Sequence, residues 1–248
     1  TDRVLVALIS TFVLIPRGHS HNDYLRERPL FEALDAGFCS VEADVFLVEG
    51  RRLVAHERRT LSPDRTLQKL YLEPLAKRIR EKKRWVYEGQ EQTFWVLIDI
   101  KAEGAAAYAQ LRRELAEHPE LAWNPGQPAV RFVISGDRPI ADLVKDEGKF
   151  AALDGRWGDL ERGFSPEFMP WVSEAWFSHF KWAGGGDFEE AAKLRLMTEQ
   201  VHSQGRKIRF WGAPDGPGIW RAHWEAGVDF INTDRPGALR EFVLNLNR

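Results

Sequence analysis

With 248 residues, of which 44% are hydrophobic and 29% charged, the chain is long and apolar enough for a sizeable folded core, which excludes an intrinsically disordered protein. The formal net charge of −2 gives no bulk-charge argument for binding nucleic acid or an acidic membrane surface. The lone cysteine, Cys39, excludes an internal disulfide.

The N-terminal stretch from Val4 to Ile15 is an almost unbroken apolar run. It is too short to span a bilayer as a helix, and no other segment resembles a membrane anchor. Residues 1–9 fit either the remainder of a signal peptide or an N-terminal extension, which favours a secreted or periplasmic location over a cytoplasmic one. Residues 11–15 are rich in strand formers and predict the first buried strand.

A dense polar cluster, residues 17–24, follows this strand. In barrels of alternating strands and helices, the loops after the strands carry the chemistry. His19 and His21 are two positions apart and share a face in an extended chain. We expect one of the two to be catalytic and the other to orient its neighbours.

Residues 41–45 alternate between apolar and acidic side chains, which is typical of a strand. The alternation places the carboxylates of Glu42 and Asp44 on the same face. Two acids on an apolar strand are costly to bury without compensation, and a divalent cation is their natural partner. The alternative interpretation is an edge strand with two solvated acids.

The chain then turns back on itself. Glu49-Gly50 predicts a tight turn, and residues 52–55 predict a returning strand that ends at His56. This excursion brings an imidazole close to the acidic pair.

The remaining sequence alternates between strand-like and helix-like segments. Further strands are expected at residues 94–101, 129–137, 150–156, 171–178, 207–212 and 228–234. Helices are expected at residues 29–37, 76–83, 104–117, 140–145, 188–204, 218–226 and 236–246. About eight alternating units, with no linker between them, predict an α/β fold of the TIM type, a (β/α)8 barrel that forms a single domain over residues 1–248.

Polar residues at the strand ends form a pattern. Asp99 and Lys101 end the 94–101 strand, and the ends of adjacent barrel strands lie near each other. The acids at 42, 44 and 99 should therefore meet at one mouth, and three oxygen ligands fit Mg²⁺ or Ca²⁺ better than Zn²⁺. A lysine beside a metal ion needs an anion between the two cations, and phosphate is the obvious candidate. Histidines on either side suit general acid and base roles.

These motifs resemble the phosphatidylinositol-phospholipase-C-like phosphodiesterase superfamily, especially glycerophosphodiester phosphodiesterases and spider-venom sphingomyelinases D. The shared pattern runs from a histidine after the first strand, through Glu-x-Asp and a second histidine, to acid-x-Lys. It continues to the closing strands, with Phe210-Trp211 and residues 226–236. Its positions in this chain are His19, Glu42, Asp44, His56, Asp99 and Lys101.

The resemblance implies a metal-dependent phosphodiesterase that acts on a small-molecule or lipid phosphodiester as a monomer. A cation on the three acids would offset phosphate charge, and Lys101 would hold a second phosphate oxygen. His19 is expected to be the general base and His56 the general acid, and attack by a hydroxyl of the substrate would give a cyclic phosphate. Asn22, His21 and Trp211 are expected to contact the substrate.

The chain departs from the glycerophosphodiesterase signature at residues 19–24, His-Ser-His-Asn-Asp-Tyr. This departure leaves the substrate open, and it leaves open whether His19 or His21 is catalytic. Side chains expected to support the site from strand ends are Ser135, Asp154 and Asp234. Trp182, beside the glycines at 184–186, is a candidate for a lid over the site.

Two other functions remain open. His19-Ser20-His21 could begin a transition-metal site of the amidohydrolase or PHP type, which needs further ligands from His179, His202, His223 or Asp234. The helical pattern around 202 and 223 speaks against it, and it leaves the acids and Lys101 without a role. The second alternative is a barrel that binds a ligand without catalysis.

Overall fold

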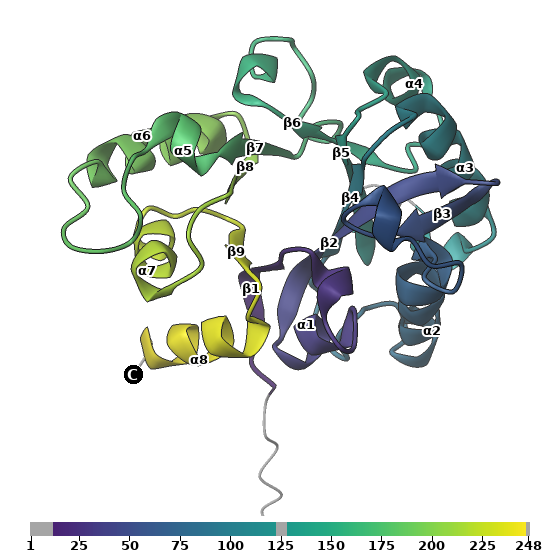
Figure 1. The fold of residues 1–248 in the computed structure, drawn as a ribbon, viewed down its shortest axis with the longest axis horizontal. Coiled ribbons are helices and arrows are strands. Elements are labelled where there is room, and N and C mark those ends of the chain that lie inside the picture. The colour runs from purple at the N-terminus through teal and green to yellow at the C-terminus, as the bar shows by residue number, and fades with distance from the viewer. Residues whose placement is uncertain (1–11, 123–127, 247–248) are drawn as a thin grey trace, which may run out of the picture.

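The chain forms a barrel of eight parallel strands with helices around the outside (Figure 1). The structure is a computed structural model that describes residues 12–122 and 128–246. Neighbouring strands follow the order β8-β7-β6-β5-β4-β2-β1-β9. A parallel bridge between Arg209 and Phe230 brings β8 to β9 and nearly closes the ring. The expected (β/α)8 barrel is confirmed.

The eight barrel strands are β1 (Ile15–Ser20), β2 (Phe38–Val48), β4 (Phe94–Ile100), β5 (Val130–Gly136), β6 (Ala152–Gly155), β7 (Trp171–Ala175), β8 (Lys207–Trp211) and β9 (Ile231–Thr233). The helices are α1 (Phe31–Asp35), α2 (Glu73–Glu81), α3 (Gly104–Ala116), α4 (Ile140–Lys145), α5 (Trp176–His179), α6 (Ala191–Ser203), α7 (Pro217–Glu225) and α8 (Pro236–Leu246). Short helical turns include η1 (Asp23–Leu25), η2 (Arg58–Thr60) and η5 (Trp157–Asp159).

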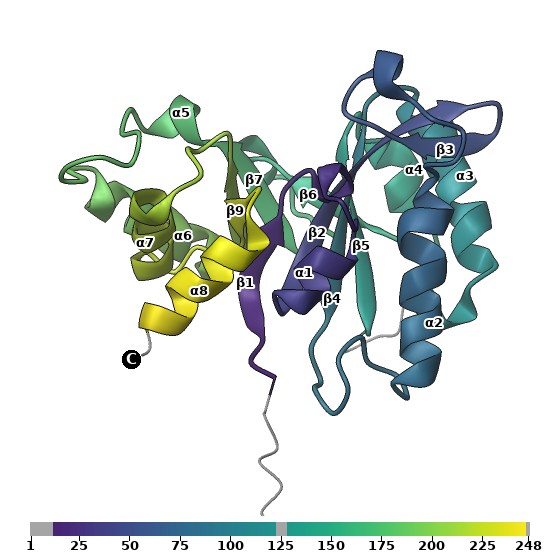
Figure 2. The same cartoon turned by 60° about the horizontal axis from the view of Figure 1, so that its bottom comes forward.

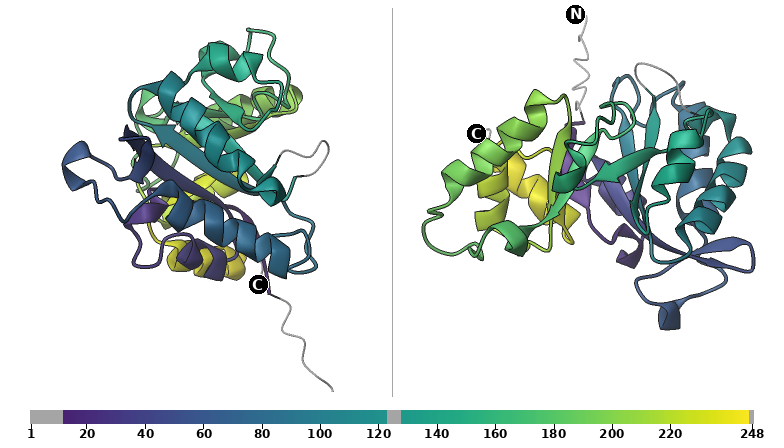
Figure 3. Two further views of the ribbon diagram at one scale, coloured as in Figure 1. Left: turned by 90° about the vertical axis from the view of Figure 1, so that its right-hand side faces the viewer. Right: turned by 90° about the horizontal axis from the view of Figure 1, so that it is seen from above.

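Strand β2 is longer than its neighbours and leaves the barrel. Its second half pairs antiparallel with β3 (Arg51–Val54) through the turn at Glu49 and Gly50, both of which have positive φ. The excursion, drawn in dark blue, projects beyond the barrel in Figures 2 and 3 and returns the chain to the barrel mouth at His56. The predicted turn and returning strand are therefore present.

The inside of the barrel is layered because alternate residues of each strand point inward. One layer is an apolar cluster that includes the stacked rings of Trp95 and Trp171 and the ring of Phe230, 4.2 Å from that of Trp171. Two residues further along the strands, the inward positions become polar. Examples are Leu97 followed by Asp99 on β4, and Trp171 followed by Ser173 on β7. The apolar layer closes the barrel below the polar layer.

Three sequence predictions need correction. The first strand was expected at residues 11–15, but β1 begins at Ile15 and includes Pro16-Arg17-Gly18-His19, because parallel pairing with β2 and β9 extends through the polar cluster. The expected strand at 171–178 ends at Ala175, where α5 begins. The expected strand at 228–234 is limited to Ile231–Thr233.

The N-terminal prediction for residues 1–9 lies outside the described residues. Among the residues that are described, no helix combines the length and the apolar character needed to cross a bilayer.

Candidate active site at the barrel mouth

A cavity of about 270 Å³ opens at the end of the barrel where the strands finish. Nine of the residues that line it were already expected from the sequence to act in the site or to support it. They are His21, Asn22, Glu42, His56, Asp99, Lys101, Ser135, Asp154 and Trp211. These residues from separate sequence motifs lie around one cavity, whereas His19 and Asp44 are not among the residues that line it.

Glu42, Asp44 and Asp99 form the acidic centre of this cavity. Each offers one carboxylate oxygen, and these oxygens lie within 4.8 Å of one another. The arrangement follows from strand register, since Asp44 and Asp99 are direct partners in the parallel pairing of β2 with β4. Glu42 and Asp44 are buried, and Asp99 is partly exposed. The interpretation as a solvated edge strand is wrong.

The two oxygens of Asp44 have different surroundings. Oδ2 accepts hydrogen bonds from the hydroxyl of Tyr24 at 2.8 Å and from Nδ1 of His56 at 3.1 Å, and it lies 2.8 Å from Nζ of Lys101. Oδ1 is buried and has no hydrogen-bond partner among the described residues. Burial, followed by the nearby charge of Glu42, raises the pKa of Asp44. The positively charged partner of Asp44 therefore lies at Oδ2, and Oδ1 has no charged partner among the described residues.

Glu42 is held by two residues of the barrel interior. Its Oε2 accepts hydrogen bonds from Nη2 of Arg209 at 2.6 Å and from Nε2 of His19 at 3.3 Å. Burial alone would raise the pKa of Glu42, but Arg209 and the hydrogen bond from His19 outweigh it and hold the pKa far below its usual value. Glu42 is therefore ionised, and its orientation is fixed by two partners from other strands, His19 on β1 and Arg209 on β8.

His19 lies in the barrel interior and does not line the cavity. Its Nδ1 accepts a hydrogen bond from the hydroxyl of Ser40 at 2.7 Å, while Nε2 donates to Glu42. The ring also packs edge-on against Trp171 and Phe230. Burial, followed by the charge of Arg209, lowers the pKa of His19 to about 4. The imidazole is therefore neutral near pH 7, with both nitrogens occupied.

His21 and His56 are the two histidines that line the cavity. His21 has 31% of its side chain exposed, and its Nδ1 lies 3.1 Å from Oδ1 of Asp234. His56 is 57% exposed, and its Nδ1 is held by Asp44. Each imidazole is thus anchored at Nδ1 by a carboxylate, which leaves Nε2 available to a ligand.

The pKa of His21 is raised above its usual value. Burial acts in the opposite direction, but the hydrogen bond with Asp234 and the charge of Glu42 outweigh it. Asp234, which the sequence suggested as a supporting residue or as a ligand in the transition-metal alternative, is oriented in turn by Arg26, whose Nη2 lies 3.2 Å from its Oδ1.

Lys101 and Asp99 complete the acidic side of the cavity. Nζ of Lys101 lies 2.8 Å from Oδ2 of Asp99 and from Oδ2 of Asp44, so one ammonium group bridges two carboxylates. Burial alone would lower the pKa of Lys101. The two carboxylates together have the larger effect and raise this pKa, which keeps the side chain charged. Gly136 provides the space for Asp99, because a Cβ at this positive-φ position would lie 2.0 Å from its Oδ1.

Sequence reasoning missed several polar residues of the site. Arg209, Tyr24 and Ser40 contact the catalytic candidates directly, and Arg156 and Ser173 line the cavity. Arg209 carried a signal, since it alternates with the apolar Ile208 and Phe210 and therefore had to face the barrel interior. The neighbouring sequence could not identify the partner of Arg209, because Glu42 lies 167 residues away along the chain.

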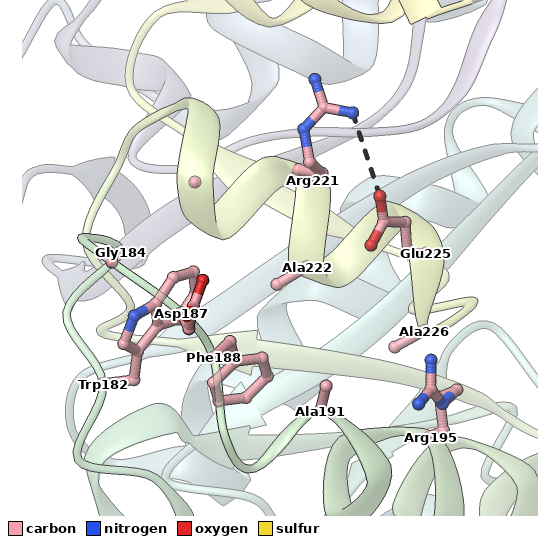
Figure 4. A pocket seen from close by; sticks show the side chains of 12 residues that line it. Trp182, Gly184, Asp187, Phe188, Ala191, Arg195, Arg221, Ala222, Glu225 and Ala226 are labelled. Atoms are coloured by element: carbon pink, nitrogen blue, oxygen red, sulfur yellow. Dashed lines mark ion pairs between the residues drawn. The ribbon is translucent and has the colours of Figure 1, made fainter.

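Trp182 and the glycines at 184–186 do not line the active-site cavity. Trp182, Gly184 and Gly186 line a second cavity, of about 370 Å³, between α6 and α7 (Figure 4). There Trp182 stacks on Phe188 with ring centroids 4.6 Å apart, and its indole nitrogen donates to the carbonyl of Gly185 at 2.7 Å. In this conformation Trp182 is not a lid over the acidic centre.

The histidines of the transition-metal alternative lie apart from His19 and His21. His179 bonds Glu174, His202 bonds Asp229, and His223 is buried in α7. Within the described residues, the one group of three or more ligand side chains in metal-binding geometry consists of the three acids and contains no histidine. The geometry therefore favours an oxygen-ligand site.

The acidic centre fits a hard divalent cation. It offers three carboxylates at metal-binding separation, and one of their oxygens, Oδ1 of Asp44, is buried without a partner among the described residues. Mg²⁺ and Ca²⁺ prefer such oxygen ligands, whereas Zn²⁺ prefers nitrogen and sulfur. Glu42, Asp44 and Asp99 are the residues that would hold the ion.

The sequence matches the family described as the AIM6-like phosphodiesterase domain over residues 9–125, which include the motifs from His19 to Lys101. Three fungal relatives are proteins named altered inheritance of mitochondria protein 6 or its homologue. The one from Arthroderma benhamiae is 27% identical, over 90% of this chain and 82% of that protein. Those from Lachancea thermotolerans and Saccharomyces cerevisiae are 28% and 27% identical, over 89% and 80% of this chain. The chain spans only 64% and 62% of the length of these two relatives.

Two solved bacterial structures share the fold. The glycerophosphodiester phosphodiesterase of Agrobacterium tumefaciens has a TM-score of 0.55 and 17% identity, over 93% of this chain and all of that one. A Silicibacter pomeroyi protein assigned as a glycerophosphoryl diester phosphodiesterase has a TM-score of 0.53 and 13% identity, over 94% and 95%. The resemblance to the phosphatidylinositol-phospholipase-C-like phosphodiesterase superfamily that the sequence motifs indicated is confirmed.

Proposed function

We propose that this chain is a metal-dependent phosphodiesterase in which His21 and His56 are the general base and the general acid. The observation that carries the proposal is the pair of carboxylate-anchored imidazoles beside three clustered acids and a lysine in one cavity. Imidazole can act as a general acid or a general base, so two imidazoles can move protons on both sides of a phosphate. Lys101, together with a cation held by the three acids, would supply the positive charge that a phosphodiester requires.

His21 takes the role that the sequence suggested for His19. A general base must reach the proton that it removes, and His19 lies outside the cavity lining with both nitrogens hydrogen-bonded. Within the part of the chain that the structure describes, the Nε2 of His21 has no such partner, and the anchoring of His21 by Asp234 strengthens it as a base. We therefore infer that His19 is a positioning residue, which holds Glu42 in place.

The proposed reaction begins when the phosphate binds with one oxygen near Lys101. His21 accepts the proton of the attacking hydroxyl, which belongs either to water or to a neighbouring alcohol of the substrate. His56 donates its proton to the departing alkoxide. A bound Mg²⁺ or Ca²⁺ would supply a positive charge that offsets charge on the phosphate in the transition state.

Trp211 offers a surface for the alcohol that leaves. It ends β8 at the cavity and is 45% exposed, which is unusual for so large an apolar side chain. The indole face can pack against an apolar or cationic group of the substrate.

Phosphorus NMR on a panel of glycerophosphodiesters, lysophospholipids and sphingomyelin tests the proposal. We expect turnover that EDTA abolishes and that Mg²⁺ or Ca²⁺ restores. A cyclic phosphate signal would identify the substrate's own hydroxyl as the nucleophile. Restoration by Zn²⁺ or Mn²⁺ alone would favour the transition-metal alternative, and no turnover of any phosphodiester would favour the non-catalytic barrel.

A further inference from the structure

Three buried residues of the polar segment after the first strand have no part in the proposed reaction. They are Ser20, Asp23 and Tyr24. Their neighbours His21 and Asn22 line the active-site cavity, whereas these three do not. The same segment is where the chain departs from the glycerophosphodiesterase signature, so the role of its buried residues has to come from the contacts that they make in this chain.

Asp23 anchors the turn that follows β1. Its Oδ1 accepts a hydrogen bond from the hydroxyl of Ser20 at 2.7 Å, and its Oδ2 accepts one from the hydroxyl of Tyr71 at 2.8 Å. The backbone N–H of Leu30 also donates to Oδ2. Because residues from three different segments hold this buried carboxylate, the short helical turn η1 that begins at Asp23 has a fixed position.

Tyr24 reaches from this anchored turn to the acidic centre. Its hydroxyl donates to Oδ2 of Asp44 at 2.8 Å, and it also lies 3.1 Å from Oδ1 of Asn22 and 3.4 Å from Nδ1 of His56. The carboxylate is the nearest of these three groups and, as an ionised acceptor, the strongest. Since Tyr24 is buried and does not line the cavity, it can affect a reaction there only through other residues.

The hydrogen bond from Tyr24 limits how Asp44 can move. The last side-chain torsion of an aspartate is broad, so its carboxylate can tilt unless a partner holds it. Oδ2 of Asp44 also accepts from Nδ1 of His56 at 3.1 Å and lies 2.8 Å from Nζ of Lys101. Lys101 is expected to hold the phosphate, whereas the Tyr24 hydroxyl is buried on a fixed turn. A tilt of the carboxylate would break that bond and leave a buried hydroxyl without an acceptor.

We propose that Tyr24 is a positioning residue that acts through Asp44 and holds His56 where its Nε2 can protonate the departing alkoxide. The inference rests on the proposed function, in which His56 is the general acid. General acid catalysis matters most for a leaving group that is a strong base, and little for one that departs as a stable anion. The buried residues of the segment thus act in series, since Asp23 fixes the turn and Tyr24 carries that fixed position to Asp44.

The test compares two phosphodiesters of glycerol that differ in the leaving group, which is ethanol in one and the far more acidic p-nitrophenol in the other. The full chain is assayed at saturating Mg²⁺ or Ca²⁺, so a change in cation affinity does not enter kcat. Tyr24→Phe should lower kcat for release of ethanol by tenfold to about a hundredfold, and kcat for release of p-nitrophenol by less than about threefold.

Tyr108→Phe is the matched control, because Tyr108 is also buried and its hydroxyl donates to a carboxylate, that of Asp146, outside the site. It should keep the wild-type ratio of the two rates. Tyr24→Phe retains the buried ring and removes only the hydroxyl, so it should fold, which circular dichroism will verify. In a His56→Gln background the proposed acid is absent, and Tyr24→Phe should lower the release of ethanol no further.

The outcomes separate this inference from the proposed function. Equal losses of kcat for the two esters in Tyr24→Phe would indicate a merely structural role and overturn the inference. No loss for either ester, or a further tenfold loss in the His56→Gln background, would overturn it as well. In each of these cases the phosphodiesterase proposal stands. Wild-type protein that cleaves neither ester nor any member of the phosphorus NMR panel would reject the phosphodiesterase function itself.

Discussion

The imidazole of His21 lies 3.1 Å from the carboxylate of Asp234, although 213 residues separate them in the chain. The pair joins the polar cluster after β1 to the residue that follows β9, and these two strands are parallel neighbours. A carboxylate at Nδ1 fixes the tautomer and orientation of an imidazole and raises its basicity. The closure of the barrel thus builds one half of the proposed acid–base pair.

We predict that Asp234→Asn lowers kcat by tenfold to about a hundredfold, in line with the effect of removing a group that orients a functional histidine. It should also shift the pH–rate profile. Asp234 raises the pKa of His21, so its removal lowers that pKa and moves the acidic limb of the profile to lower pH. The pH dependence of kcat/KM measures this shift.

Asp215→Asn serves as a comparison for this variant. Asp215 accepts a hydrogen bond from the backbone N–H of Asp234 and does not contact His21. If Asp234→Asn and Asp215→Asn shift the acidic limb of the pH–rate profile equally, the shift comes from a disturbed loop and not from loss of the carboxylate at Nδ1 of His21.

A second prediction separates the two histidines of the motif. His21→Gln should reduce turnover at least about a hundredfold, the size expected for loss of a general base, with little change in thermal stability because His21 is partly exposed. His19→Gln should lower the melting temperature, because it disturbs two buried hydrogen bonds, and should retain a larger share of the activity per folded molecule. Activity assays combined with thermal melts distinguish the two variants. The opposite ranking would restore His19 as the catalytic residue.

The order of the barrel and the meeting of Asp44 with Asp99 could be predicted from the sequence. Period-two alternation fixes which face a strand residue occupies, and parallel strands end at the same edge. Which of His19 and His21 lines the cavity could not be predicted. It depends on where β1 ends, and Pro16 and Gly18 look like loop residues until pairing with two neighbouring strands is known. The ion pair between Arg209 and Glu42 could not be predicted either, because no local sequence pattern reveals a contact between distant strands of the barrel.

A third prediction concerns the cation. Asp99→Asn should weaken Mg²⁺ or Ca²⁺ binding at least tenfold and reduce turnover in parallel, because it removes one of three oxygen ligands. Asp99 is a better test than Glu42, since neutralising Glu42 would leave Arg209 buried without its charged partner and would also destabilise the fold. Isothermal titration calorimetry with each ion measures the affinity. Asp142→Asn, at an exposed position of α4, controls for the loss of one negative charge. Equal affinities in wild type and Asp99→Asn would contradict the metal assignment.

The last prediction concerns His223, which lies in α7 with both ring nitrogens buried and without a partner among the described residues. Its ring packs against those of Trp176 and Phe210, at centroid distances of 5.1 and 5.8 Å. Burial, followed by the charge of Arg17, lowers the pKa of His223 to about 3. The folded protein thus keeps this imidazole neutral at a pH where the unfolded chain, with a usual pKa near 6.5, is protonated.

Between pH 6.5 and 3 the unfolded state therefore binds more protons at this site, and the free energy of unfolding falls as the pH falls. From pH 7 to pH 4 the loss from His223 alone should be about 3 kcal/mol, on the scale of 1.36 kcal/mol per pH unit. His223→Leu, which removes the titrating group, should lose correspondingly less stability over this range in urea denaturation. A His223→Leu protein as sensitive to acid as the wild type would show that the acid sensitivity arises elsewhere.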